Sequence, residues 1–166
     1  MEIFRGVALI TATITMGLVA GVFGLYANTI MPGLRRTDDR TFVGAFQSMD
    51  NRIINPLFMA TFVGALVLTG LTAGLHVGGH SRPVLPWIAA AFVLYLAAVV
   101  ITLAVNVPLN DGIKAAGDPD GIGDLAAVRK RFNEPRWAAW NVVRAVTTTA
   151  AFGCLAWALV SYGELK

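Results

Sequence analysis

Long uncharged segments dominate the chain and predict its secondary structure. Asp, Glu, Lys and Arg are absent from residues 6–34, 53–81, 83–110 and 145–163. An α-helix needs about 20 apolar residues to cross the roughly 30 Å hydrocarbon core of a bilayer. Each segment is long enough, or nearly so. We therefore predict a single membrane domain over residues 1–166, with spans at about 4–31, 56–76, 84–105 and 136–162.

The polar connections between spans carry a second hydrophobic pattern, with helical period. Residues 35–52 form a polar connection with a helical pattern, in which Phe42, Phe46, Met49 and the adjoining Ile53 fall on one face and Thr37 is a candidate N-cap. In the other long connection, apolar residues recur with the same kind of spacing at Leu125, Val128 and Phe132. The pattern predicts two short amphipathic helices that lie on the bundle or at the membrane interface.

Proline and asparagine mark the expected helix ends. Asn55 and Pro56 are typical of the first positions of a helix, and Asn133 can cap the fourth span. Pro108 is expected to stop or kink the third span. The order span, polar helix, span occurs twice along the chain. This order hints at a repeat, although the two halves show no convincing residue-by-residue match.

Composition agrees with a membrane protein. The chain of 166 residues is 56% hydrophobic and 14% charged, with a mean hydropathy of +0.65, whereas soluble domains average about 25% charged residues. We predict an all-α, four-helix membrane bundle. The alternative, a soluble helical protein with an unusually apolar core, would leave little polar surface to cover four such segments. Cys154, the single cysteine, is expected to pack as a small hydrophobic side chain.

Charge distribution suggests an orientation and excludes one class of partner. Basic and acidic residues alternate within residues 35–40, which argues against a nucleic-acid surface of one sign. Most of the 13 Lys and Arg residues lie in the two long connections. The positive-inside rule then places these connections in the cytoplasm and both termini outside. We expect a multi-pass protein of the bacterial-type inner membrane.

Glycine pairs provide candidate contact faces between helices. Gly17 and Gly21 in the first span, and Gly70 and Gly74 in the second, have the spacing that allows a neighbouring backbone to approach closely. We expect a homo-oligomer, if one forms, to use one of these two faces.

Polar residues gather where three spans reach the side of the long connections. They are Asp50, Arg52, Asn55, Asn106, Asn110, Asp111, Trp137, Trp140, Asn141 and Arg144. Arg144 lies about two turns inside the fourth span, where a cation is costly unless it snorkels, pairs or faces a wet cavity. Asp50 or Asp111 could pair with it. One interpretation is an anion-binding pocket with aromatic walls. The other is an aromatic belt with a snorkelling arginine that only anchors the helix.

Several of these polar residues also have purely structural explanations. Asn55 needs no purpose beyond capping, and Asn106 can satisfy the backbone carbonyl that Pro108 leaves free. His76 and His80 have the spacing of a metal pair, and haem ligation is a further option for them. Gly78 and Gly79 disfavour a helix there, however, and no third ligand is near. We expect a solvated turn and no bound metal.

Three segments resemble a known family. They are Met49–Phe58 (MDNRIINPLF), Asn106–Asp111 (NVPLND) and the pattern F-x-x-P-x-W-x-x-W-N-x-x-R over residues 132–144. They are similar to the anthrone oxygenase-like family of small four-span membrane proteins, which includes fungal polyketide-tailoring enzymes and many bacterial members without an assigned reaction. The resemblance implies oxidation of anthrones to anthraquinones by molecular oxygen, without a bound metal or flavin, so we expect no cofactor.

The candidate residues suit such chemistry. Deprotonating an anthrone requires a base, for which Asp50 and Asp111 are candidates, and the resulting anion requires a cationic or amide cradle. Candidates for the cradle are Arg144, Asn141, Asn106 and Asn110. Candidates for apolar walls are Phe58, Trp137 and Trp140, and Arg52 and Asn55 would contact substrate at the entrance. The alternative is a non-catalytic membrane protein that binds a lipid, quinone or partner subunit in the same cleft.

Overall fold

A computed structural model describes residues 2–78 and 81–165, and these residues contain no strand. The helical elements, in chain order, are α1 (Glu2–Leu25), η1 (Tyr26–Ile30), α2 (Met31–Leu34), α3 (Asp39–Ile53), α4 (Pro56–Leu75), η2 (Arg82–Val84), α5 (Leu85–Ile101), η3 (Thr102–Asn106), α6 (Val107–Lys114), η4 (Pro119–Gly121), α7 (Leu125–Phe132) and α8 (Glu134–Glu164). The all-α prediction is confirmed. The helical segments long and apolar enough to cross a membrane are Glu2–Leu34, Pro56–Leu75, Arg82–Lys114 and Leu125–Glu164.

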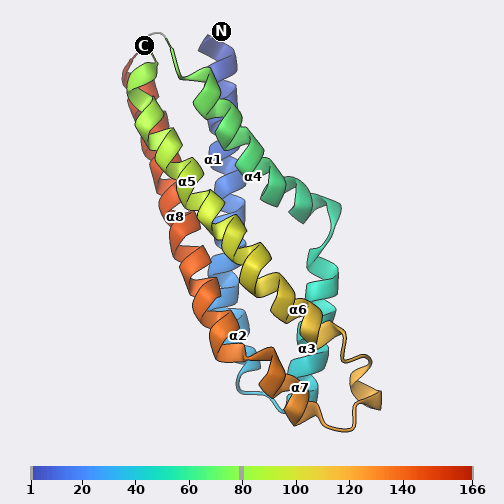
Figure 1. The fold of residues 1–166 in the computed structure, drawn as a ribbon. Helices are drawn as coiled ribbons and strands as arrows, with labels where there is room; N and C mark the ends of the chain where they lie inside the picture. The colour runs from blue at the N-terminus through green and yellow to red at the C-terminus, as the bar shows by residue number, and fades with distance from the viewer. Residues whose placement is uncertain (1, 79–80, 166) are drawn as a thin grey trace.

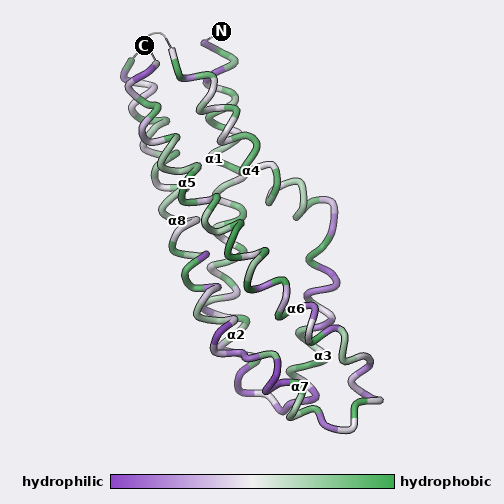
Figure 2. The backbone as a smooth tube through the Cα atoms, in the orientation of Figure 1, coloured by the Kyte–Doolittle hydropathy of each residue, from purple (hydrophilic) through white to green (hydrophobic). Residues whose placement is uncertain are grey.

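The long helices form an elongated bundle with two different ends (Figure 1). The α4–α5 connection and both termini lie at one end, and α2, α3 and α7 lie at the other. We call the second end the long-loop end. Figure 2 shows that hydrophilic backbone is concentrated at the long-loop end and at the termini, with hydrophobic helix between them. Which end faces the cytoplasm stays a prediction.

The bundle core is built around α1 and α8. α1 packs against α4 and α8, and α8 also packs against α5. Leu9, Met16, Ile88, Tyr95 and Leu155 are completely buried within this core. Large side chains on the opposite faces of the same helices are exposed, as expected for helices that face lipid on one side.

The two amphipathic helices, α3 and α7, enclose a second apolar cluster at the long-loop end. It contains Phe42, Phe46, Phe132 and Trp137, with the rings of Phe46 and Phe132 centred 4.5 Å apart. The structure places the α3 N-cap at Asp38, one residue after the predicted Thr37. Asp38 accepts hydrogen bonds from the Thr41 amide and hydroxyl, which hold the pKa of this carboxyl below its ordinary value.

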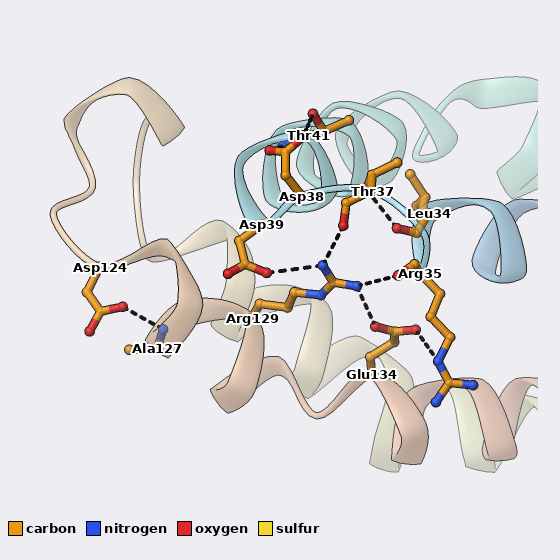
Figure 3. A network of polar contacts seen from close by, with 10 residues as sticks. All are labelled: Leu34, Arg35, Thr37, Asp38, Asp39, Thr41, Asp124, Ala127, Arg129 and Glu134. Atoms are coloured by element: carbon orange, nitrogen blue, oxygen red, sulfur yellow. Dashed lines mark hydrogen bonds and ion pairs between the residues drawn. The ribbon is translucent and has the colours of Figure 1, made fainter.

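Arg129 joins these peripheral helices to the bundle (Figure 3). Its guanidinium donates hydrogen bonds to the backbone carbonyls of Thr37 and Arg35 and to the carboxylates of Asp39 and Glu134, at 2.9 to 3.1 Å. The same guanidinium lies 4.2 Å from the ring centre of Phe42. One side chain of α7 thereby ties the α2–α3 connection to the start of α8.

The predicted asparagine caps are confirmed. The side-chain oxygen of Asn55 accepts from the amides of Leu57 and Phe58, which fixes the start of α4. Asn133 caps α8 through the Arg136 amide and has a left-handed backbone, with φ of 56°. Asparagine tolerates this conformation better than most residues, so Asn133 both ends α7 and begins α8.

The helix in the third span does not stop at Pro108. Instead it widens into the π-helix η3, in which the Val107 amide bonds to the Thr102 carbonyl, and then continues as α6 to Lys114. A π-turn adds a residue to the turn, which accommodates a proline with little bending. The first span has the same device at the same offset, because η1 is followed by Pro32 as η3 is followed by Pro108. The first and second halves of the chain therefore resemble each other in their order of helical elements.

Two of the glycines predicted to form helix contacts pack against aromatic rings of the same chain. A Cβ atom at Gly17 would come within 3.0 Å of the Phe152 ring, and one at Gly70 would come within 3.2 Å of the Phe92 ring. These glycines therefore serve packing within the chain. Gly21 and Gly74 face open space, and association through their faces stays a prediction.

Candidate functional site

A cavity of about 250 Å³ lies inside the long-loop end of the bundle. It is bounded by the end of α1, η1, α3, the first turns of α4, η3, α6 and the start of α8. Aromatic rings form much of its wall, from Phe23, Tyr26, Phe46, Phe58, Phe62 and Trp137. Polar side chains also reach it, from Asp50, Thr102, Asn110, Asp111, Lys114, Asn141 and Arg144. Such a mixture, mostly apolar with a few placed polar groups, is typical of ligand sites.

The cavity opens toward the outside of the bundle, at the surface shared by α4 and η3. Ile54 and Leu103 line the cavity and are both 62% exposed, and Met59 beside them is 39% exposed. Asp111 and Lys114 also line it, at the long-loop end. The rim is therefore apolar on the side of the span and charged on the side of the connections.

Arg144 provides a buried cation at the cavity. The residue is only 5% exposed. Its Nη2 atom donates to Oδ1 of Asn141 at 2.8 Å, and its Nη1 atom donates to Oγ1 of Thr102 at 3.1 Å. The guanidinium carbon lies 4.4 Å from the ring centre of Phe23 and 5.5 Å from that of Trp137. Neutral groups and aromatic faces thus hold the charge, and cation–π contacts of this kind stabilise a desolvated cation.

No carboxylate pairs with Arg144 in the part of the chain that the structure describes. The pairing with Asp50 or Asp111 suggested by the sequence is therefore not found. The Nε atom of Arg144 is also buried without a hydrogen-bond partner among the described residues. A cation buried at membrane depth without a counter-ion is costly. This side chain thus presents both a positive charge and a free N–H donor.

The two aspartates instead share Lys114. Oδ2 of Asp50 lies 2.8 Å from Nζ of Lys114, and Oδ1 of Asp111 lies 3.2 Å from the same atom. Oδ1 of Asp50 accepts from Nδ2 of Asn110 at 2.6 Å, and Oδ1 of Asn110 accepts from Nε1 of Trp137 at 2.6 Å. The exposed side-chain fractions rise from 9% at Asp50 to 24% at Lys114 and 64% at Asp111. This chain of contacts leads from the cavity to the surface.

The structure brings most of the predicted site residues to one place. The cavity is lined by Asp50, Phe58, Asn110, Asp111, Trp137, Asn141 and Arg144. Asn106 is 1% exposed and lies behind the wall, where it donates to the carbonyl of Trp137 at 3.3 Å. Asn55 is occupied with its capping bonds, whereas Arg52 and Trp140 are exposed outside the cavity.

Other lining residues escaped the sequence reasoning. Phe23 and Tyr26 come from the first span, which we expected to supply only glycine-mediated packing. Thr102 is the hydrogen-bond partner of Arg144, and Lys114 the ion-pair partner of Asp50. A tyrosine and a threonine at the same distance before Pro32 and Pro108 were one available signal. The ordinary helical period was a second signal, because Tyr26 follows Val22 by four residues and Thr102 follows the buried Ala98 by four.

The histidine prediction has a different outcome. His76 is completely buried rather than solvated, and its Nδ1 atom lies 2.7 Å from the Thr72 carbonyl. Its ring packs edge-on against Tyr162, with centres 5.5 Å apart. His80 lies outside the described residues. Within residues 2–78 and 81–165, no group of three or more His, Cys, Asp or Glu side chains is placed to hold a metal ion.

Comparison with known proteins identifies the family. A family model described as anthrone oxygenase matches residues 42–154, more than half of the chain. The chain belongs to the anthrone oxygenase family. No curated protein and no solved structure matches it. The region matched by the anthrone oxygenase model begins in α3 and ends in α8, so it contains Asp50, Asn110 and Arg144 but not Phe23 or Tyr26.

Proposed function

We propose that this member of the anthrone oxygenase family is a membrane-embedded oxygenase that oxidises an anthrone-type polycyclic phenol with molecular oxygen. The observation that most strongly supports this proposal is the position of Arg144. It is a buried cation at the wall of an aromatic cavity, and it has no carboxylate partner among the described residues. A flat aromatic ligand with an ionised oxygen matches both features. The aromatic rings would cover its faces, and its oxygen would supply the missing negative charge.

The proposed reaction converts the ring methylene of the substrate into a carbonyl. A base removes one methylene proton, and the charge of the resulting anion spreads onto the substrate oxygen. The anion gives its electrons to dioxygen, and a carbon–oxygen bond forms to yield a hydroperoxide. Loss of the second methylene proton then cleaves the O–O bond. One oxygen atom stays in the product and the other leaves as water, so one dioxygen is consumed for each substrate.

Arg144 and Asn141 would act on the anion. The guanidinium stabilises the charge on the substrate oxygen, which lowers the free energy of the anion and of the transition state that leads to it. Asn141 holds the guanidinium through its 2.8 Å bond and is itself fixed by a 3.2 Å bond from its Nδ2 atom to the Phe23 carbonyl. The cation is therefore oriented before substrate arrives, which avoids reorganisation during the reaction.

Asp50 would act as the base. It is the more buried of the two aspartates and faces the cavity, but both of its oxygens are engaged by Asn110 and Lys114. We propose that Lys114 moves toward Asp111 when substrate binds, because Lys114 already contacts that second carboxylate. Oδ2 of Asp50 is then free to accept the proton.

Substrate would reach this cavity from the bilayer. The opening is lined by three exposed apolar side chains. Met59 and Leu103 lie on helical segments apolar enough to cross a membrane, and Ile54 lies in the short connection just before α4. An apolar polycyclic molecule partitions into the hydrocarbon region, so entry at this rim needs no passage through water. The sideways opening also suits the second candidate function, which is binding a lipid or quinone without turnover.

Purified protein in lipid nanodiscs, supplied with an anthrone under isotopically labelled oxygen gas, tests the proposal. One labelled atom per anthraquinone, with one dioxygen consumed for each product and a rate above that of empty nanodiscs, is the expected result. Anthrone or a lipid that binds in the cavity without any product above the empty-nanodisc rate would overturn the enzymatic proposal in favour of the binding function.

A further inference from the structure

Tyr26 is the cavity residue for which neither the family match nor the sequence pattern provides a role. It is the first residue of η1, it is half-buried, and it lines the cavity. Its ring lies 5.9 Å from that of Trp137, which in turn contacts Arg144. Its hydroxyl has no hydrogen-bond partner among the described residues. The ring is therefore held in place while the polar end stays free.

The helical period of α1 brings Tyr26 to this position, because Tyr26 follows Val22 by four residues and Phe23 by three, and both of these residues also line the cavity. Tyr26 and Thr102 share a further feature, which is that each is the first residue of a π-helix. Each π-helix thus begins with a residue that faces the cavity, Tyr26 in η1 and Thr102 in η3, and each precedes a proline at the same offset. An extra residue in one turn shifts the facing of the residues that follow it by about 100°, because a regular helix has 3.6 residues per turn. Single π-turns inside α-helices are frequent at functional sites.

Thr102 and Tyr26 differ in whether their hydroxyl groups are free to donate a hydrogen bond to a ligand. The Thr102 hydroxyl cannot donate to a ligand without breaking an existing bond, because its proton is donated to the Ala98 carbonyl at 2.8 Å, while its oxygen accepts from Arg144. The Tyr26 hydroxyl interacts electrostatically with both Arg144 and Asp50 but is hydrogen-bonded to neither. Together with the free Nε–H of Arg144, the cavity therefore holds two donors without acceptors. A buried donor without an acceptor is destabilising, so the Nε–H of Arg144 favours a ligand that brings an acceptor, and the Tyr26 hydroxyl is available beside it.

We propose that the Tyr26 hydroxyl donates a hydrogen bond to the same substrate oxyanion that Arg144 binds, which makes Tyr26 a further catalytic residue. This inference rests on the proposed function, because it deepens the description of the same site. An oxyanion has enough lone pairs to accept from the guanidinium and from a neutral hydroxyl at once. The neutral donor adds stabilisation without placing a second charge in the membrane, where another cation would be costly.

The variant Tyr26→Phe isolates this role, because it keeps the ring against Trp137 and removes only the hydroxyl. Its matched control is Tyr162→Phe, in which the lost hydroxyl contacts Glu2 at the opposite end of the bundle. The ligand to use is a dihydroxyanthraquinone, whose visible absorption shifts to longer wavelength when a phenol ionises. Its apparent pKa, measured when bound to the full-length protein in nanodiscs, reports how strongly the site stabilises the oxyanion without requiring turnover.

We expect Tyr26→Phe to raise the apparent pKa of the bound dihydroxyanthraquinone by about one unit, a tenfold weaker preference for the anion. Its kcat for anthrone oxidation should fall about tenfold with KM nearly unchanged, whereas Tyr162→Phe should match wild type in both assays.

An unchanged pKa in Tyr26→Phe would overturn the role of Tyr26 and leave the proposed function intact. Absence of anthrone oxidation by wild type would overturn the proposed function, and the titration would still decide whether Tyr26 binds the anion. A wild-type protein that binds no dihydroxyanthraquinone would overturn both.

Discussion

The Thr102 hydroxyl accepts a 3.1 Å hydrogen bond from Nη1 of Arg144, and this bond joins η3 to α8 at the cavity wall. The donor is the buried cation of the site, and the acceptor is the first residue of a π-helix. The irregular turn that accommodates Pro108 thus also provides a partner for Arg144. Thr102 follows the buried Ala98 by four residues, so the regular period of α5 brings its side chain to the face where Arg144 lies.

Replacing Thr102 with valine tests this relationship. The side chain keeps its shape, but Nη1 of Arg144 loses its acceptor, so the guanidinium should become less well oriented. Hydrogen bonds to charged groups contribute about 1.5 to 3 kcal/mol, and we expect anthrone oxidation to slow by about tenfold or more. The rate of anthraquinone formation, followed by absorbance, measures the effect.

The matched control is Thr11→Val. The Thr11 hydroxyl also donates to the carbonyl four residues earlier in its own helix, at 2.8 Å, but Thr11 does not line the cavity. A loss of activity in Thr11→Val as large as in Thr102→Val would show that general helix destabilisation, rather than the contact with Arg144, causes the effect.

Asp50 and Lys114 should be energetically coupled. Their side chains are 9% and 24% exposed and lie 2.8 Å apart. Removing one partner from a buried pair leaves an uncompensated charge, whereas removing both can be nearly neutral. We expect Asp50→Asn and Lys114→Met each to lower the free energy of unfolding, and the double variant to lower it by at least about 1 kcal/mol less than the sum of the two.

A double-mutant cycle in mild detergent, with unfolding by denaturant, measures this coupling. The pair Arg40 and Asp120 provides a comparison, because both side chains are well exposed and should couple by less than about 1 kcal/mol. Strictly additive effects of Asp50→Asn and Lys114→Met would contradict the ion pair.

Arg129 should be important for stability but not for binding. Its guanidinium satisfies two backbone carbonyls and two carboxylates from different elements (Figure 3). Lysine cannot reproduce this planar, forked arrangement, so we expect Arg129→Lys to lower the free energy of unfolding by about 2 kcal/mol. Thermal unfolding in detergent measures it, and the exposed neighbour Arg131, changed to lysine, should show almost no effect. Equal melting temperatures for the two variants would refute the bridging role.

The transmembrane helices could be predicted from the sequence, because an uncharged segment and the capping residue before it are recognisable from neighbouring residues alone. Asn55 and Asn133 were identified as caps since a polar side chain before an apolar helix with an early proline has few other structural uses. The N-cap of α3 is Asp38 and not the predicted Thr37. Both side chains can accept a hydrogen bond from the first turn of a helix, so the sequence alone does not decide which of the two residues caps it. Local signals therefore locate where α3, α4 and α8 begin, but they placed the end of the third span at about 105, nine residues before the helix ends at Lys114.

The site was only partly predictable because its geometry depends on contacts between distant segments. Arg144 and Asn141 stood out as polar residues at membrane depth, and Asp50 and Asn110 by their position at span ends. The partner of Arg144 proved to be Thr102 rather than an aspartate, because Lys114 engages both carboxylates. Tyr26 lies on the same helix face as Phe23, three residues earlier, and both line the cavity. The helical period places them on one face but does not predict that this face borders a cavity.

The central claim is that Arg144 stabilises an anion during oxidation, and one comparison of oxygen uptake tests it most directly. Wild type, Arg144→Met and the control Arg136→Met, which removes an exposed cation two turns earlier in α8, are supplied with an anthrone at saturating concentration in nanodiscs. Losing such an electrostatic donor should reduce the rate by at least about a hundredfold in Arg144→Met, with Arg136→Met close to wild type. Equal rates of oxygen uptake in Arg144→Met and wild type, with both proteins folded, would contradict the account.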